Sequence, residues 1–215
     1  MPRLITGLDA ARVHENLERT KQAIADAGRD PGEVEILAAV KYVPLEELDV
    51  LGEAGLTLLG ENRAQDLEAK ATKHPEFRWH FIGQLQSRKV KQIVPHVELI
   101  HSVASHSALN QLERHGTPEI EILLEVNVAD EPGKAGIDPA ELRDYLERSA
   151  VTVSGLMTMP PFTEDPEDSR RYFAKLRELA HEHGLKHLSM GTSQDFAVAA
   201  AEGATIVRIG TTLYT

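Results

Sequence analysis

The sequence predicts a closed (β/α)8 barrel, the TIM-barrel architecture, in one domain that spans residues 1–215. Eight short apolar segments alternate with longer amphipathic segments, a pattern typical of a parallel sheet with helical crossovers. Eight such units favour closure into a barrel over an open sheet. No linker rich in Pro, Gly or Ser divides the chain, so we expect a single domain.

The first predicted element is a helix over residues 9–27 that precedes the repeating units. Val13, Leu17 and Ile24 recur at helical spacing, and Gly28 supplies a C-terminal stop. Because no strand precedes this helix, it is an addition to the N-terminal side of the barrel.

The first predicted strand, residues 34–40, is rich in branched side chains. Pro44 and the acidic pair Glu46 and Glu47 then open a helix, with negative charge in its first turn where the helix dipole favours it. The same alternation continues to the C-terminal end. The further strands are predicted at 56–59, 78–82, 97–101, 120–126, 151–157, 187–189 and 205–209, and the helices at 63–73, 87–94, 107–115, 139–149, 165–183 and 193–202.

An open, doubly wound sheet is the structural alternative. Such sheets often bind dinucleotides through a Gly-x-Gly-x-x-Gly turn after the first strand. The segment after residues 34–40 lacks this turn, which weakens the dinucleotide-binding version of that fold.

Composition restricts the class of protein. The net charge of −11, from 23 basic and 34 acidic side chains, repels nucleic acid and anionic lipid on average. The chain has no cysteine, which excludes disulfides, a thiolate nucleophile and cysteine-bound zinc and fits a cytoplasmic protein. Neither a secretory signal nor an apolar run of about 18 residues is present, so we expect no membrane association.

Lys41 directly follows the first predicted strand. In a barrel the functional groups sit at the C-terminal ends of the strands. An amine there, partly desolvated by apolar walls, has a lowered pKa and is a nucleophile that forms imines with aldehydes. A solvated lysine at a strand end is the alternative, and from this residue alone it is favoured.

A phosphate site is predicted after the seventh and eighth strands, where barrels commonly bind phosphate. Gly191 permits an unusual turn and Ser193 is a suitable N-cap for the next helix, whose first N–H groups can bind an anion. The second loop repeats the pattern with Gly210 and Thr211. Each motif alone also fits an ordinary turn or helix cap. Further hydroxyl donors are available from Ser189 and Thr192.

Arg208 lies within the eighth predicted strand, close to these loops. A structural ion pair is one interpretation. The other is that its guanidinium, which can only donate hydrogen bonds, faces a pyridine nitrogen and leaves that nitrogen unprotonated.

Taken together, these residues resemble the pyridoxal 5′-phosphate (PLP) homeostasis protein family, also described as proline synthetase co-transcribed homologues. The resemblance runs nearly end to end. The matching segments are Ala39-Val40-Lys41 with Pro44, Gly60-Glu61-Asn62, Trp79 to Ser87, His101-Ser102-Val103, Glu125 to Val128, Gly133 to Gly136, Gly155 to Met159, Leu188 to Gly191 with Ser193 and Asp195, and Val207 to Thr211.

The resemblance implies a barrel of the alanine racemase N-terminal-domain type that binds PLP as its cofactor. By position, Lys41 matches the lysine that holds PLP as a Schiff base, Asn62 a residue close to the cofactor, and Arg208 the residue that faces the ring nitrogen. The phosphate-holding positions are matched by Ser189, Ser193, Gly210 and Thr211.

The family implies a cytoplasmic carrier or buffer of PLP without established catalysis, so no catalytic residue is assigned. Expected partners are PLP and PLP-requiring apo-enzymes, and a monomer is favoured over a dimer. One departure is Tyr42, which stands where relatives often have small or polar residues.

A weak amino-acid racemase is the alternative function. Racemases on this barrel have a second domain that supplies an opposing tyrosine, and proton transfer on both faces of an imine needs two bases. No such domain follows the eighth predicted strand, and Tyr42 and Tyr214 are not obvious opposing bases. These observations favour a carrier.

A metal protein is a third interpretation, raised by His181, Glu182, His183 and His187. Residues two apart point to different faces of a helix, and the zinc-protease pattern of two histidines four apart is absent. We therefore expect no metal site. The third matched segment also contains His80, which either lines the pocket or is a packed, hydrogen-bonded histidine.

Overall fold

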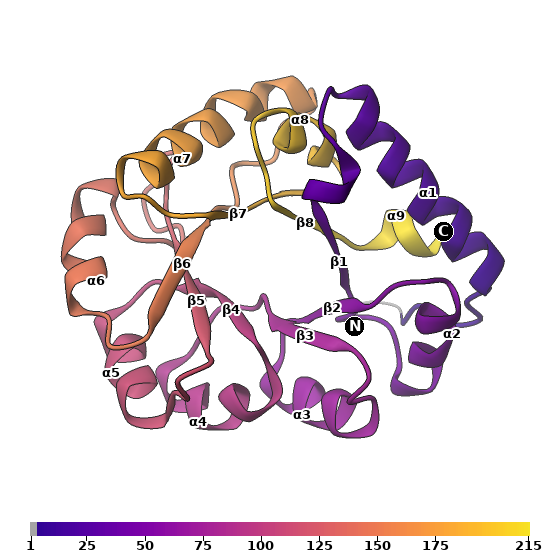
Figure 1. Cartoon of the computed structure of the whole chain (residues 1–215), viewed down its shortest axis with the longest axis horizontal. Coiled ribbons are helices and arrows are strands. Elements are labelled where there is room, and N and C mark those ends of the chain that lie inside the picture. The colour runs from indigo at the N-terminus through magenta and orange to yellow at the C-terminus, as the bar shows by residue number, and fades with distance from the viewer. Residues whose placement is uncertain (1–3) are drawn as a thin grey trace.

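The computed structural model describes residues 4–215, and these form the predicted closed barrel of eight parallel strands in chain order (Figure 1). The first and last strands pair with each other, so the sheet has no free edge. The strands are β1 Glu35–Ala39, β2 Leu58–Glu61, β3 Arg78–Phe81, β4 Leu99–Val103, β5 Glu121–Glu125, β6 Thr152–Met157, β7 His187–Thr192 and β8 Ile206–Ile209.

Helices surround the strands on the outside of the barrel (Figure 1). They bury one apolar side against the strands, while the charged side faces solvent, as expected for amphipathic helices. The helices are α1 Ala10–Asp26, α2 Leu48–Glu53, α3 Ala64–Lys73, α4 Val90–Ile93, α5 His106–His115, α6 Leu142–Arg148, α7 Arg170–Glu182, α8 Phe196–Ala201 and α9 Thr211–Tyr214.

The additional N-terminal helix is confirmed as α1. The Asp9 carboxylate accepts a hydrogen bond of 2.8 Å from the backbone N–H of Arg12, which caps the first turn. Val13, Leu17 and Ile24 are buried, and the helix lies beside α8 and α9 (Figure 1). It therefore covers the junction between the first and last strands.

The predicted boundaries around β7 and α8 differ from those of the structure. The strand continues to Thr192, and the helix begins at Phe196 with Asp195 as its N-cap residue. The carboxylate of Asp195 accepts hydrogen bonds from the backbone N–H of Thr192 at 2.8 Å and from its hydroxyl at 3.1 Å. This turn occupies residues 192–195, so the prediction that Ser193 is the N-cap of the helix is wrong.

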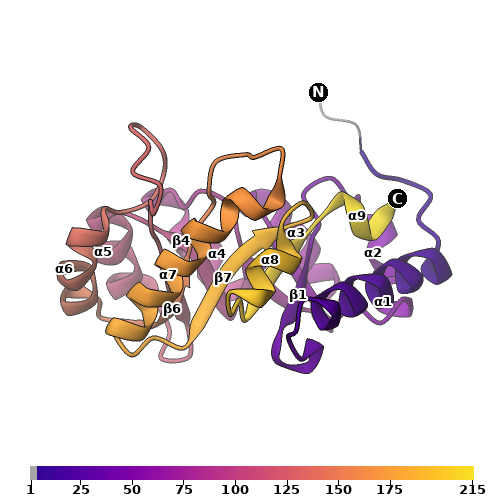
Figure 2. The same ribbon diagram turned by 90° about the horizontal axis from the view of Figure 1, so that it is seen from above.

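A separate apolar cluster, with one side chain from each of six strands, fills the interior of the barrel. Such filling makes the barrel a packed core and leaves ligand sites to the loops at the strand ends. Figure 2 shows the loops after β5 and β6 rising on the same side as α9. The cluster consists of Leu37, Leu58, Leu99, Leu123, Met157 and Ile206.

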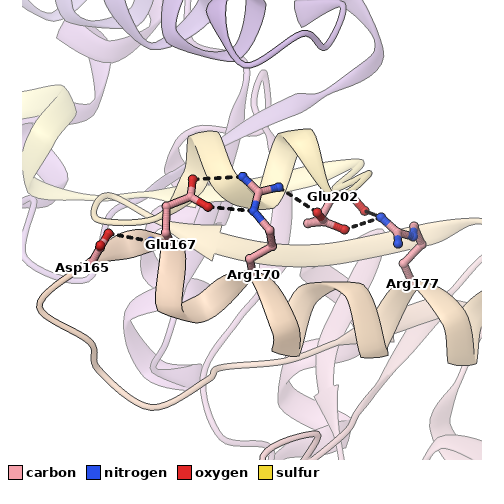
Figure 3. A network of polar contacts seen from close by, with 5 residues as sticks. All are labelled: Asp165, Glu167, Arg170, Arg177 and Glu202. Atoms are coloured by element: carbon pink, nitrogen blue, oxygen red, sulfur yellow. Dashed lines mark hydrogen bonds and ion pairs between the residues drawn. The ribbon is translucent and has the colours of Figure 1, made fainter.

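An ion-pair network joins α7 to the end of α8 (Figure 3). Glu202 is largely buried and pairs with Arg170 at 2.7 Å and with Arg177. Arg170 also pairs with Glu167, in the turn before α7. The network fixes the helix that follows the β7 loop. Across residues 4–215, no helix combines the length and apolar character needed to cross a membrane.

Candidate functional site

A pocket of about 390 Å³ opens where the predicted site residues converge. Its volume lies within the roughly 300–1,000 Å³ usual for small-molecule sites. The wall combines residues from the ends of β1, β2 and β8 with residues from the loops after β6 and β7. The lining residues are Ile5, Ala39, Lys41, Tyr42, Asn62, Ile82, Met159, Thr192, Ser193, Gln194, Arg208, Gly210, Thr211 and Tyr214.

Lys41 lies in the turn that follows β1, with its side chain at the solvent-accessible side of the pocket. Its Nζ atom is 4.7 Å from the centroid of the Tyr42 ring. Two hydrogen bonds to backbone carbonyls hold the chain just before the lysine. The Tyr214 hydroxyl donates to Ala39 at 3.2 Å, and Lys70 Nζ donates to Val40 at 2.7 Å. The base of the Lys41 side chain is thus fixed while its amine stays accessible.

A buried ion pair continues this anchoring into the second strand. Lys70 Nζ contacts Glu61 Oε2 at 2.6 Å, and the side chains are 8 % and 0 % exposed. The other carboxylate oxygen, Oε1, accepts from the backbone N–H groups of Asn62 at 2.6 Å and Arg63 at 3.1 Å. One pair of charges therefore links the backbone beside Lys41 to the backbone of Asn62.

Asn62 lines the pocket and carries a buried acceptor without a partner in the described chain. Its Oδ1 atom is buried and has no hydrogen-bond partner among residues 4–215. Buried polar atoms without partners are uncommon in folded proteins. This unsatisfied oxygen distinguishes Asn62 from the other polar residues of the pocket wall.

The loops after β7 and β8 meet at one hydrogen bond. The Ser193 hydroxyl oxygen accepts from the backbone N–H of Gly210 at 3.0 Å. Gly191 makes the preceding turn possible, because its φ of +89° favours glycine and an added Cβ would lie 2.5 Å from the Cβ of Ala199. Ser193, Gly210 and Thr211 consequently line the same end of the pocket.

Arg208 brings a buried positive charge to the pocket wall. Its guanidinium donates to the carbonyl oxygens of Ser189 at 2.8 Å and Thr158 at 2.9 Å, and also to the Ser189 hydroxyl. Burial lowers the pKa of Arg208 to about 10, opposed by the charges of Glu125 and Asp195. The group still carries its charge at neutral pH and is held in one orientation.

Six of the seven predicted site residues line the pocket, and Ser189 does not. Ser189 is completely buried, and its hydroxyl is bonded to His101 Nδ1 at 2.8 Å and to Arg208. Its position beneath the wall therefore does not suit direct contact with a phosphate in this pocket. The six are Lys41, Asn62, Ser193, Arg208, Gly210 and Thr211.

Several residues of the site carried no usable sequence signal. Tyr214 and Lys70 act on backbone carbonyls that are far away along the chain, and neither belongs to a motif. Glu61 and His101 stand inside matched segments, so the segments could have directed attention to them. His80 is a packed histidine, bonded to His101 at 2.9 Å and to Glu98 at 2.9 Å, rather than a pocket residue.

The donor set of the pocket fits PLP. Lys41 offers an amine for the aldehyde, and the hydroxyls and N–H groups near Ser193 and Thr211 offer donors for a phosphate. Arg208 places a fixed positive charge in the wall where the ring nitrogen is expected, and its terminal N–H groups are held by Ser189, Thr158 and Met159. Asn62 contributes a further polar side chain to the lining.

Metal-ligating side chains gather elsewhere. Among residues 4–215 the one group whose ligand atoms lie within 4.8 Å of one another is Asp49, His74 and Glu76. Ion pairs of His74 with Glu76 at 2.9 Å and Asp49 at 3.4 Å account for this group. His181 and His183 are not part of such a group.

Known proteins resemble this chain over most of its length. Residues 8–215 match the family described as alanine racemase, N-terminal domain. A pyridoxal phosphate homeostasis protein of Aquifex aeolicus is 43 % identical over 94 % of this chain and 96 % of its own length. The protein of the same name in Pseudomonas aeruginosa is 37 % identical over 91 % and 90 %.

Solved structures agree with these matches. PipY of Synechococcus elongatus with PLP bound has a TM-score of 0.82 and 32 % identity, covering 94 % of this chain and all of PipY. Alanine racemase of Corynebacterium glutamicum has a TM-score of 0.74 at 16 % identity, over all of this chain and 64 % of the racemase, and so shares the fold alone. The chain therefore belongs to the pyridoxal phosphate homeostasis protein family, with the barrel of the alanine racemase N-terminal domain.

Proposed function

We propose that this protein binds PLP as a Schiff base on Lys41 and takes part in intracellular PLP homeostasis as a cytoplasmic, non-catalytic carrier or buffer. One observation carries the proposal: the pocket joins an accessible amine, a buried guanidinium and the paired loops of Ser193 and Gly210. The names of the relatives and the PLP bound to PipY support it.

Formation of the Schiff base needs no reactant besides the Lys41 amine and the PLP aldehyde. The amine adds to the aldehyde carbon, an imine forms, and one water molecule leaves. PLP supplies an electron-withdrawing ring when bound. Ser193, Gly210 and Thr211 would hold the phosphate, and the Arg208 guanidinium would face the ring nitrogen. A guanidinium leaves that nitrogen unprotonated, which weakens the ring as an electron sink and suits reversible holding.

The tyrosines of the pocket also favour a carrier over a racemase. The Tyr214 hydroxyl donates a hydrogen bond to the Ala39 carbonyl, and burial together with the nearby Glu61 charge raises the pKa of this hydroxyl. It is therefore poorly suited to abstract a proton. Tyr42 adjoins Lys41 in sequence, and its ring lies beside the Lys41 amine. A low-activity amino-acid racemase is the second candidate, favoured by the shared barrel.

The covalent bond is tested by absorbance and mass spectrometry. Protein incubated with PLP should show a visible imine band, and borohydride should fix a pyridoxyl group on the peptide that contains Lys41. Lys41→Ala should lose the band and the adduct, whereas Lys21→Ala, on the exposed side of α1, should keep both. A protein that remains colourless with added PLP would refute the proposal.

Carrier and racemase are separated by two further assays. The loaded carrier should restore activity to an apo-enzyme that requires PLP, at a rate above that of buffer. In deuterium oxide, a panel of amino acids should keep their α-protons by NMR. Exchange of the α-proton that depends on Lys41 would establish the racemase instead.

A further inference from the structure

A row of polar side chains crosses the interior of the barrel beneath the pocket. It begins at Glu98, just before β4, and passes through His80 and His101 to Ser189 and Arg208. Since β4 and β7 are not neighbours in the sheet, the contact between His101 and Ser189 spans the barrel. His80, His101 and Ser189 are each at most 1 % exposed, so no water competes for their hydrogen bonds.

The direction of the hydrogen bonds follows from the Arg208 end. A guanidinium only donates, so the Ser189 oxygen accepts from it. The hydroxyl proton of Ser189 then has one acceptor among its partners, His101 Nδ1 at 2.8 Å. A neutral ring that accepts at Nδ1 carries its proton on Nε2. His101 Nε2 therefore donates to His80 Nδ1 at 2.9 Å.

The Glu98 end gives the same direction independently. A carboxylate only accepts, so His80 Nε2 donates to Glu98 Oε1 at 2.9 Å. His80 Nδ1 is then free to accept from His101, which matches the direction derived from Arg208. Each donor along the row faces one acceptor, and both histidines have the same tautomer. Burial, aided by the positive charge of Arg208, holds the pKa of His101 well below its usual range, so this ring is neutral.

We propose that Glu98, His80, His101 and Ser189 form one directed chain of hydrogen bonds that positions the Arg208 guanidinium at the pocket. Ser189 and the two histidines are positioning residues in this assignment, and they act on a bound molecule through Arg208. The effect on PLP rests on the proposed function, whereas the tautomers of the histidines are a property of the protein alone.

The tautomers are measured first, without PLP. Long-range ¹H–¹⁵N NMR at neutral pH should show His80 and His101 neutral, with the proton on Nε2. His14 provides contrast in the same spectrum, because its Nδ1 lies 3.1 Å from the Ala54 carbonyl oxygen and should carry the proton when the ring is neutral. A proton on Nδ1 of His80 or His101 would overturn the chain.

The positioning role is tested with Ser189→Ala. The imidazole nitrogen shifts of His101 and also of His80, two hydrogen bonds away, should change, and PLP should bind roughly tenfold more weakly, the effect of one hydrogen bond to a charged group. Ser154→Ala removes a buried hydroxyl that has no partner in the described chain, so it should change neither. Unchanged His80 shifts or unchanged PLP affinity in Ser189→Ala would refute the role.

A second variant covers the case in which Ser189→Ala does not fold. Ser189→Cys retains a weak donor and should give intermediate effects if Ser189→Ala does not fold. If the unaltered protein does not bind PLP, the proposed function is refuted. The tautomers of His80 and His101 would still test the hydrogen-bond chain, because they are measured without PLP.

Discussion

At the scale of single residues, the pocket depends on a few polar atoms with defined partners. The Ser193 oxygen accepts the Gly210 N–H, and the Asn62 oxygen has no partner among residues 4–215. The first atom joins two loops, and the second is a buried acceptor whose hydrogen bond is unmade. The role of each residue thus depends on which of its hydrogen-bonding atoms already have partners in the protein.

Ser193→Ala tests the junction of these loops. The substitution removes the acceptor of the Gly210 N–H and a hydroxyl at the expected phosphate position, so PLP binding should weaken by about 1–2 kcal/mol, roughly tenfold. Titration followed by the imine band measures the affinity. Ser107→Ala, on the exposed face of α5, serves as the control and should bind PLP normally. Equal affinity of the two variants would remove Ser193 from the site.

At the scale of elements, the barrel holds its strand ends with side chains from other elements. Lys70 from α3 contacts the Val40 carbonyl beyond β1 and the Glu61 carboxylate of β2, while Tyr214 from α9 contacts Ala39. Helices therefore position the backbone beside Lys41. The ion pairs of Glu202 likewise hold α7 against the end of α8 (Figure 3).

Lys70→Met should destabilise the protein strongly. It leaves the Glu61 carboxylate buried without its cation, an effect of about 3–5 kcal/mol in comparable cases. Urea unfolding measures the loss. The double variant Lys70→Met/Glu61→Gln should recover part of it, because the uncharged amide oxygen can still accept from the Asn62 N–H.

The matched control is Lys21→Met, which breaks an exposed pair with Glu18 and should cost about 0–1 kcal/mol. Similar losses for Lys70→Met and Lys21→Met would mean that the Lys70–Glu61 pair does not anchor the pocket wall.

At the scale of the whole molecule, one row of polar side chains connects opposite sides of the barrel interior. Glu98 accepts one hydrogen bond from His80 and contacts Arg78 at 2.5 Å, whereas Arg208 lies at the pocket. The fold thereby couples a half-exposed carboxylate to the cofactor side of the barrel. Such rows restrict a barrel to one arrangement because each member needs its partner.

Acid should weaken the fold in part through Glu98. Its hydrogen bond from His80, with a further one from Arg78, lowers the pKa of Glu98 from 4.5 to about 2. A carboxyl with a depressed folded-state pKa contributes stability above its unfolded pKa, and the contribution is lost as pH falls through the folded pKa. Stability should therefore decline between about pH 4.5 and 2.

Urea midpoints measured across this pH range test the expectation. Glu98→Gln should show a shallower decline than the unaltered protein, because the amide does not titrate. Glu113→Gln, at an exposed position of α5, should follow the unaltered protein. A decline of equal slope in Glu98→Gln would show that other groups control the acid response.

The sequence by itself determined the barrel, the N-terminal helix and most of the pocket. These features depend on local patterns: apolar periodicity sets each element, and parallel strands bring Lys41, Asn62, Arg208 and Gly210 to one end of the barrel. Motifs at strand ends therefore predict a site without knowledge of side-chain directions.

Only the tertiary structure decided which polar groups meet. His101 and Ser189 are 88 positions apart, and Lys70 reaches a carbonyl 30 positions away, so no local pattern relates them. Ser189, for which the family resemblance predicted a phosphate contact, is completely buried and does not line the pocket. The side-chain partners inside a barrel depend on how distant strands align, because each residue faces neighbours contributed by the rest of the chain.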